Sequence, residues 1–240
     1  MKLAIMQPYL FPYAGYFQLV ASVDRFVFYD DVNYIKGGWI NRNRLYMSGG
    51  VRWFTVHLQA ASAHRKINQL HVAPDHFWRR KLLASVSDAY RKAPYFEQAY
   101  AMLADVIHSS DTSLSALARS SVIAVARYIG LQTEFVVSTE RYGNEYLTGA
   151  DRVLDICLRE GAEEYHNLPG GTGLYAAEKF ATSGVTLRFV QPALRPYSQF
   201  NRPFQPGLSA LDLLMFNDRL SARRLMGKAV IDEQVAEILG

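Results

Sequence analysis

The chain has 240 residues, of which 50% are hydrophobic and 20% charged, with 26 Lys and Arg against 22 Asp and Glu. This composition excludes intrinsic disorder, which requires low hydrophobicity and high net charge, and the length suffices for a large buried core. The net charge of +4 comes without a basic tract, so it does not indicate nucleic-acid binding. A single cysteine excludes an intramolecular disulfide framework and a multi-cysteine metal site.

The N-terminal apolar run is too short for a membrane helix or a signal peptide. It extends from Leu3 to Met6 and is interrupted by Gln7 and Pro8. No other stretch reaches the length of a membrane span. We therefore expect a cytoplasmic protein without a membrane-spanning segment.

The first thirty residues predict a strand, a helix and a second strand. Leu3–Gln7 is a buried strand, Tyr16–Val23 a short amphipathic helix, and Arg25–Tyr29 a strand that ends at Asp30 and Asp31. Such a unit implies parallel strands.

Further along the chain, strands and helices continue to alternate. Strands are expected at Arg52–Leu58, Glu134–Val137, Glu164–His166 and Thr186–Val190. Helices are expected at Asp75–Tyr90, Glu97–Ser109, Ser113–Ile129 (ended by Gly130), Thr148–Glu160, Leu174–Thr182, Ser209–Phe216 and Ile231–Leu239. The pattern predicts an α/β fold: one domain over residues 1–240, with a mostly parallel sheet, flanking helices and a helical insertion at about 75–130.

The loop after the first strand is the first candidate binding segment. Ligands of open α/β sheets bind beyond the carboxyl ends of the strands. This loop supplies Gln7, Tyr9 and, at the start of the following helix, Tyr16. A phosphate or carboxylate could bind there, although the segment matches no phosphate-loop motif. The alternative is a rigid turn, set by its prolines, that packs aromatic rings under the sheet.

The segment after the second strand is the second candidate. It contains a carboxylate, a lysine, a tryptophan, an amide and a guanidinium that could bind or polarise a substrate: Asp30, Lys36, Trp39, Asn41 and Arg42. The alternative is a β-hairpin turn at Gly37-Gly38 with solvated charges.

The third candidate segment starts at Tyr165 and His166 and continues through a glycine run to Tyr175. If the strands are parallel, we expect His166 to face the same sheet edge as Gln7 and Asp30, where its near-neutral pKa would suit proton transfer. The alternative is a structural histidine followed by a loop that needs positive φ angles.

Two other residue types are weaker candidates. Cys157 lies in a predicted amphipathic helix and behaves there as a small hydrophobic residue. The histidines are spaced irregularly, with no HExxH pair, so we expect no metal site.

The N-terminal segment, residues 1–45, resembles the WbqC-like protein family. The matching motifs are Gln-Pro-x-x-x-Pro-x-x-Gly-Tyr-Phe from Gln7, Asp-x-Phe-x-x-x-Asp from Asp24 and Trp-x-Asn-Arg-Asn from Trp39. Lys92–Phe96, Tyr197-x-Gln199 and Leu208–Leu214 extend the resemblance over nearly the whole chain. Members of this family occur in O-antigen, polysaccharide and natural-product gene clusters. The resemblance implies amide formation or acyl transfer onto an amino group, for instance on an amino sugar.

A looser similarity is to the nucleotidylyltransferase-like fold of pantothenate synthetase, in which a comparable loop holds ATP. The His-x-Gly-His signature of those enzymes has no counterpart in Pro12–Tyr16.

Three hypotheses follow. The first is an amide-forming acyl or aminoacyl transferase that acts on a small amine, with a carrier protein as one potential donor. Its catalytic residues would be Asp30, His166 and Lys36, and its substrate-binding residues Gln7, Tyr9, Tyr16, Trp39, Asn41, Arg42, Tyr165 and Gln199. The second is a ligase or nucleotidylyltransferase that uses ATP and Mg²⁺. The third is a non-catalytic partner in a polysaccharide assembly complex.

Overall fold

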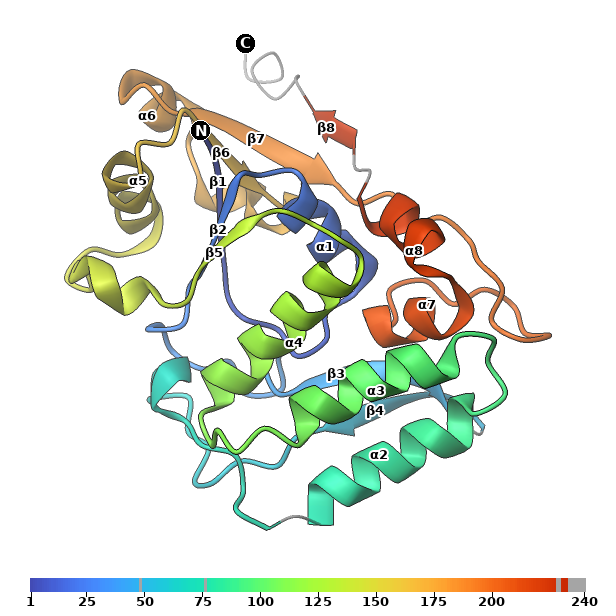
Figure 1. The fold of residues 1–240 in the computed structure, drawn as a ribbon. Coiled ribbons are helices and arrows are strands. Elements are labelled where there is room, and N and C mark those ends of the chain that lie inside the picture. The colour runs from blue at the N-terminus through green and yellow to red at the C-terminus, as the bar shows by residue number, and fades with distance from the viewer. Residues whose placement is uncertain (48, 76, 228–229, 233–240) are drawn as a thin grey trace.

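A six-stranded sheet forms the centre of the computed structural model, which describes residues 1–47, 49–75, 77–227 and 230–232 (Figure 1). Its strand order is β5-β2-β1-β6-β7-β8. The bounds are β1 Lys2–Met6, β2 Arg25–Phe28, β5 Glu134–Val136, β6 Glu164–Asn167, β7 Thr186–Gln191 and β8 Val230–Asp232. The first five strands in this order pair in parallel, and β8 pairs antiparallel to β7. The α/β fold with a mostly parallel sheet is thus confirmed.

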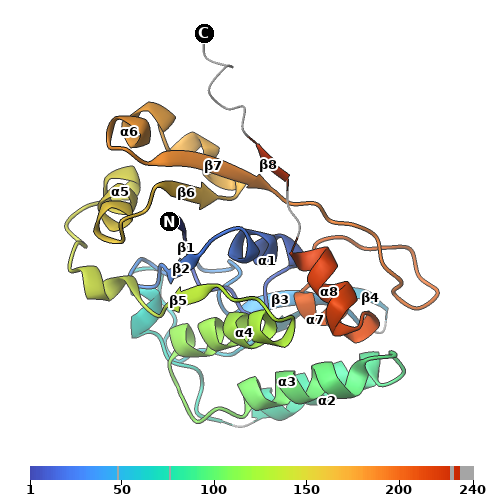
Figure 2. The same ribbon diagram turned by 45° about the horizontal axis from the view of Figure 1, so that its top comes forward.

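Helices cover both faces of this sheet (Figures 1 and 2). On one side lie α1 (Ala14–Ala21) and α4 (Leu114–Tyr128), and on the other lie α5 (Gly149–Arg159) and α6 (Ala177–Thr182). The alternation of side chains along β1 explains the two layers, because successive residues of a strand point to opposite faces. Ala4 joins the cluster with α1 and α4, whereas Leu3 and Ile5 join the cluster with α5 and α6.

A second, two-stranded sheet lies beside the first. It pairs β3 (Arg42–Met47) antiparallel with β4 (Gly50–Thr55). Around it and α4 are α2 (Phe77–Tyr90), α3 (Phe96–Ile107), α7 (Ala210–Phe216) and α8 (Arg219–Met226). Both α2 and α7 contact β3, while α3 contacts α4 and α7. Short 3-10 turns occur at η1 (Ile67–Gln69), η2 (Thr139–Tyr142) and η3 (Pro169–Leu174).

Most predicted elements are present, and several helix ends agree with the expected capping. Ser113 caps α4, its side chain accepting from the backbone N–H of Ala116, and Gly130 follows the helix with φ of 75°. Pro94 lies between α2 and α3, as a helix-breaking residue should.

Other expectations were wrong. The strand predicted at Arg52–Leu58 begins and ends earlier, as β4, and pairs with β3, which was not predicted. The helix predicted from Leu174 starts only at Ala177, because the preceding residues form η3. The turn at Gly37 joins strands of two different sheets and is not a hairpin.

The C-terminal prediction falls partly outside the described residues. Of the helix expected at Ile231–Leu239, Ile231 and Asp232 belong to β8. Residues 233–239 lie beyond the part that the structure describes. The charge pair Arg223-Arg224 indicated a solvated helix face, and it lies in α8, although the bounds of that helix were not predicted.

Candidate substrate pocket

The strand order creates a switch point between β1 and β6. After β1 the chain enters α1 on one face, and after β6 it leads to α6 on the other. Loops that leave neighbouring parallel strands in opposite directions open a crevice, where ligands of open α/β sheets bind. The loop from Gln7 to Tyr13 leaves β1 at this switch point, and it lines a pocket on the side of the small sheet.

Three segments that are distant in sequence meet at this loop. The backbone N–H of Leu10 donates to the carbonyl of Trp39 at 3.1 Å. The C-terminal segment joins them: Ser209 N–H donates to the Arg44 carbonyl at 3.0 Å, and Ala210 N–H donates to the Pro12 carbonyl at 2.9 Å. The β1 loop, the start of β3 and the segment before α7 therefore form one unit.

A pocket of about 300 Å³ opens between these segments. Its lining combines aromatic rings, one amide and one guanidinium: Tyr9, Pro12, Tyr13, Trp39, Asn43, Arg44 and Gly207. Burial raises the pKa of both Tyr9 and Tyr13, so these phenols are neutral at physiological pH. No carboxylate or imidazole belongs to this lining. The pocket is suited to a ring-bearing ligand with an acceptor or anionic group.

The loop that supplies Tyr9, Pro12 and Tyr13 to the pocket also contains a strained, fully buried residue, Phe11, whose φ is +42°. Its N–H donates to Ser121 Oγ at 2.8 Å. Its carbonyl accepts from Asn43 Nδ2 at 2.8 Å and from Ser209 Oγ at 2.7 Å. Side chains from α4, β3 and the N-terminus of α7 thus hold this left-handed conformation. Strain held in place by its surroundings is a frequent feature of binding sites.

Close packing at the start of α1 fixes a second part of the wall. A Cβ added to Gly15 would lie 2.8 Å from Cβ of Pro192 and would also collide with the ring of Tyr13. The glycine therefore lets Tyr13 lie along the helix and line the pocket.

Arg44 is the charged group of the pocket. Its Nη2 donates to the Gly207 carbonyl at 3.1 Å, whereas its Nε is buried without a hydrogen-bond partner. Its guanidinium carbon lies 5.4 Å from the ring centroid of Trp39 and 5.9 Å from that of Trp53. The indole rings therefore hold a cation that still has N–H groups to offer.

Among the predicted binding residues, Tyr9 and Trp39 line the pocket. Tyr16 does not: its ring is fully buried, and its hydroxyl donates to the Gln7 carbonyl at 2.8 Å. Tyr16 and the Gln7 backbone thereby support the loop from below. For this part of the β1 loop, the arrangement agrees with the alternative stated above, a rigid turn that packs on aromatic rings.

Asn41 and Arg42, predicted to bind substrate, do not line the pocket. Asn41 accepts from the Tyr34 hydroxyl and donates to the Val56 carbonyl, both within the protein. The Arg42 side chain bonds the carbonyls of Gly37 and Gly38 at the edge of the small sheet. The next amide and guanidinium, Asn43 and Arg44, line the pocket instead. The motif Trp-x-Asn-Arg-Asn located this segment but not the residues that face the cavity.

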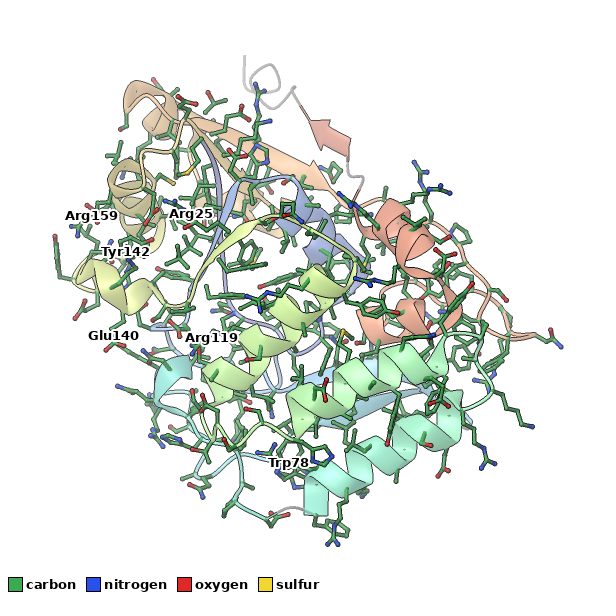
Figure 3. The ribbon with its side chains drawn as sticks, viewed as in Figure 1. Arg25, Trp78, Arg119, Glu140, Tyr142 and Arg159 are labelled. Atoms are coloured by element: carbon green, nitrogen blue, oxygen red, sulfur yellow. The ribbon has the colours of Figure 1, made fainter. Side chains whose placement is uncertain are left out.

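Asp30 is buried in a network of hydroxyl groups. Ser115 Oγ donates to its Oδ2 at 2.5 Å and Ser138 Oγ to its Oδ1 at 2.6 Å. Arg119 lies 3.9 Å from Oδ2. Figure 3 shows Arg119 on α4 and Glu140 on η2 near the end of β5. The contacts of this carboxylate tie β2 to α4 and to the segment after β5, and Asp30 does not line the pocket.

Asp31 is equally enclosed, since it accepts hydrogen bonds from Thr139 Oγ1 and from Arg152. Arg152 lies on α5, so this ion pair fastens the end of β2 to the opposite helical layer. Two neighbouring carboxylates thus connect to the two faces of the sheet.

The expectation that His166 faces the same edge as Gln7 and Asp30 was wrong. His166 pairs with Ala4 in the middle of the sheet, and its ring is fully buried. Nδ1 lies 3.0 Å from Ser22 Oγ, and Nε2 lies 2.9 Å from Glu164 Oε2. Ser22 follows the C-terminal end of α1 and Glu164 begins β6, so the imidazole points away from the carboxyl edge of the sheet.

Tyr165, Lys36 and Gln199 also lie outside the pocket lining. Tyr165 is fully buried on the opposite face and stacks on Phe180. Lys36 lies exposed in the turn before Trp39. Gln199 is buried and donates to Asp212 Oδ1 at 2.7 Å. Gln199 therefore supports the chain that leads to Gly207.

The structure also describes the surroundings of Cys157 and of the residue types that could bind a metal ion. Burial raises the pKa of Cys157 to about 12, which leaves the thiol protonated and unreactive. Within residues 1–47, 49–75, 77–227 and 230–232, no group of three His, Cys, Asp or Glu side chains is arranged to hold a metal ion. In that same part of the chain, no helix is both long and apolar enough to cross a bilayer.

Comparisons with known proteins place the chain in a family. The model of the WbqC-like protein family matches residues 7–224. The uncharacterized protein Rv1507c of Mycobacterium tuberculosis is 31% identical over 217 residues, which cover 89% of this chain and 92% of that protein. No solved structure matches. The family match includes all three segments of the pocket, and the chain belongs to the WbqC-like protein family.

Proposed function

We propose that this protein is an amide-forming transferase that moves an acyl or aminoacyl group onto the amine of a small molecule held in the substrate pocket. The observation that carries the proposal is the pocket itself. Aromatic rings enclose it and the guanidinium of Arg44 reaches it, at the carboxyl end of β1. An amino sugar or a similar amine with an anionic group fits such a lining.

The reaction would be the aminolysis of an activated acyl donor. The amine nitrogen attacks the carbonyl carbon, the C–N bond forms, and the thiolate or alkoxide of the donor leaves. The protein contributes mainly by holding the amine next to the donor, since positioning alone can lower such a barrier greatly. Aromatic walls keep water from the acyl carbon, which favours aminolysis over hydrolysis.

The pocket lining offers no side chain that could act as a base at neutral pH. The proton of the amine therefore passes to water at the open mouth. We expect the rate to rise with pH until the amine of the substrate is deprotonated, with no additional inflection near pH 6.5 from a histidine. Initial rates between pH 5.5 and 9.5, measured with two amines of different pKa, test this expectation. An inflection that stays fixed when the amine is changed would contradict it.

The proposal is tested by incubating the purified protein with amino sugars and acyl or aminoacyl thioesters, including donors on a carrier protein. Mass spectrometry detects the new amide. Arg44→Gln should lower product formation about 10-fold or more, because a charge-assisted contact to the substrate is lost. Arg52→Gln is the matched control: Arg52 is exposed and lies on the opposite face of the same small sheet. Absence of amide with every donor, or equal losses in both variants, would overturn the proposal.

A further inference from the structure

The outer face of the small sheet carries arginines and tryptophans stacked on one another. The Arg42 guanidinium carbon lies 4.2 Å from the ring centroid of Trp53, and the Arg44 guanidinium lies beside the pair formed by Trp53 and Trp39. The ring centroids of Trp39 and Trp53 are 5.0 Å apart. Both side chains stay accessible, with exposed fractions of 37% for Trp39 and 45% for Trp53. This face adjoins the substrate pocket, because Trp39 and Arg44 belong to both.

The charges of this face are not compensated. In the described part of the chain, no carboxylate oxygen lies within ion-pair distance of Arg42 or Arg44. Arg119 and Arg152, by contrast, both approach carboxylates. The Arg42 side chain donates to two backbone carbonyls and that of Arg44 to one, while Arg44 Nε is buried without a hydrogen-bond partner. A buried N–H without an acceptor is costly, and a ligand oxygen would remove that cost.

The geometry of the strand places these two cations side by side. Arg42 and Arg44 are two residues apart on β3, so their side chains leave the same face at a spacing of roughly 7 Å. A guanidinium stacked on an indole ring keeps its N–H groups in the plane away from the ring. Arg42 uses its Nε and Nη2 on backbone carbonyls, which leaves the N–H groups of Nη1 for a phosphate oxygen, and Arg44 has Nε and Nη1 to offer. The neighbouring rings of Tyr9, Tyr13 and Trp39 offer faces on which a nucleobase can stack.

We propose that the substrate bound in this pocket carries a nucleoside diphosphate, so that the amine acceptor is a nucleotide-activated sugar. Arg42 and Arg44 bind the two phosphates, the pocket rings hold the base, and the sugar with its amine extends towards the mouth. This assignment rests on the proposed function for the role of the amine, but the binding of the nucleotide can be measured without turnover.

Binding is tested by tryptophan fluorescence and calorimetry with UDP, dTDP and GDP, each compared with its nucleoside and with inorganic pyrophosphate. The protein has three tryptophans, and Trp78 is only 3% exposed, so a ligand-dependent quench reports on Trp39 and Trp53. We expect at least one diphosphate to bind about 10-fold or more tightly than its nucleoside and than pyrophosphate, since base and phosphates each contribute.

Variants locate the site. Arg44→Gln and Arg42→Gln should each weaken the diphosphate about 10-fold or more, and Arg44→Lys should restore only part of the affinity, because lysine keeps the charge without the planar fork. Arg52→Gln should bind as the unmodified protein does. Unfolding midpoints of the same samples show whether each variant is folded. Equal binding of nucleoside and diphosphate, equal loss in Arg52→Gln, or no binding of any diphosphate would overturn the assignment.

Failure of this inference differs from failure of the proposed function. If an amide forms on a plain amine and no diphosphate competes, the nucleotide assignment is wrong and the transferase proposal stands. If a diphosphate binds through Arg42 and Arg44 but no donor yields an amide, the nucleotide site stands and the transferase proposal is wrong.

Discussion

Asp212 shows how a single buried side chain can organise several segments. Its carboxylate accepts from the hydroxyls of Tyr90 at 2.6 Å and Tyr197 at 2.7 Å, and from Gln199 Nε2 at 2.7 Å. The Tyr90 hydroxyl in turn accepts from the backbone N–H of Tyr46 on β3. Burial raises the pKa of Asp212, and these donors favour its ionised form. The carboxylate joins α2, β3, α7 and the segment before Gly207.

We expect Asp212→Ala to lower the free energy of unfolding by about 3–5 kcal/mol, because buried donors lose their acceptor. Asp212→Asn should cost less, since its amide oxygen still accepts from some of them. Urea unfolding measures both values. Asp88→Ala, on the exposed side of α2, is the control and should change stability by less than about 0.5 kcal/mol. A loss for Asp212→Ala no larger than that of the control would contradict this role.

His166 predicts a pH dependence of stability. Burial lowers the pKa of this imidazole below its usual 6.5. As the pH falls below about 6.5, this histidine becomes protonated in the unfolded chain but stays neutral in the folded protein. The free energy of unfolding therefore decreases. His166→Gln, which cannot titrate, should flatten the slope of unfolding free energy between pH 7.5 and 5.5, whereas the exposed His64→Gln should leave it unchanged. An unchanged slope in His166→Gln would show that other groups cause it.

At the scale of elements, the sequence predicted the strands and helices of the parallel sheet but not β3. Hydrophobic runs and caps identify elements that bury one face, as in β1 and α4. β3 reads as Arg-Asn-Arg-Leu-Tyr-Met, and its polar residues hide a strand whose buried positions include an amide, Asn43. Had Arg42–Met47 been recognised as a strand, alternation would have put Arg42 and Arg44 on one face and Asn41 and Asn43 on the other. The local sequence was too polar for hydrophobic alternation to indicate the strand β3.

The same limit explains His166. The sequence located its strand, but which face and which edge a residue occupies depends on register and on partners such as Ser22, more than a hundred residues away. The acceptors of Asn43, the carbonyls of Leu10 and Phe11, are likewise set only by the tertiary fold.

Asn43 tests how elements shape the pocket. Asn43→Ala removes both hydrogen bonds to the β1 loop, and we expect a loss of about 1–3 kcal/mol in unfolding free energy. Ligand binding in the pocket should weaken as well, because Phe11 loses one of the contacts that hold its positive φ. Asn33→Ala, on an exposed loop, is the control for both measurements. Weakened stability with unchanged binding would show that the loop keeps its shape without Asn43.

At the scale of the whole molecule, we propose that residues 75–130 unfold together with the sheet, as parts of one domain. The α4 residue Ser121 accepts a hydrogen bond from Phe11, and the α2 residue Tyr90 donates one to Asp212, so this region shares buried hydrogen bonds with the β1 loop and with α7. The three tryptophans lie at positions 39, 53 and 78, all in or near the small sheet and α2, whereas far-ultraviolet circular dichroism reports on all elements.

We therefore expect urea transitions followed by fluorescence and by circular dichroism to coincide, as they do for a two-state domain. A fluorescence transition at clearly lower urea would show that the small sheet and α2 form a separate cooperative unit. Repeating the experiment with Asp212→Asn should move both transitions by the same amount.

The hydrogen bonds with Ser121, Asn43 and Ser209 that hold Phe11 have a consequence for the newly synthesised chain. Of the side chains that hold this residue, Ser209 comes almost two hundred positions later, and Gly207 completes the cavity. A ribosome that has synthesised the five parallel strands has still not released these residues. The growing polypeptide can therefore assemble most of its sheet before its pocket is complete, and ligand binding becomes possible only after residues 207 and 209 have left the ribosome and reached the β1 loop.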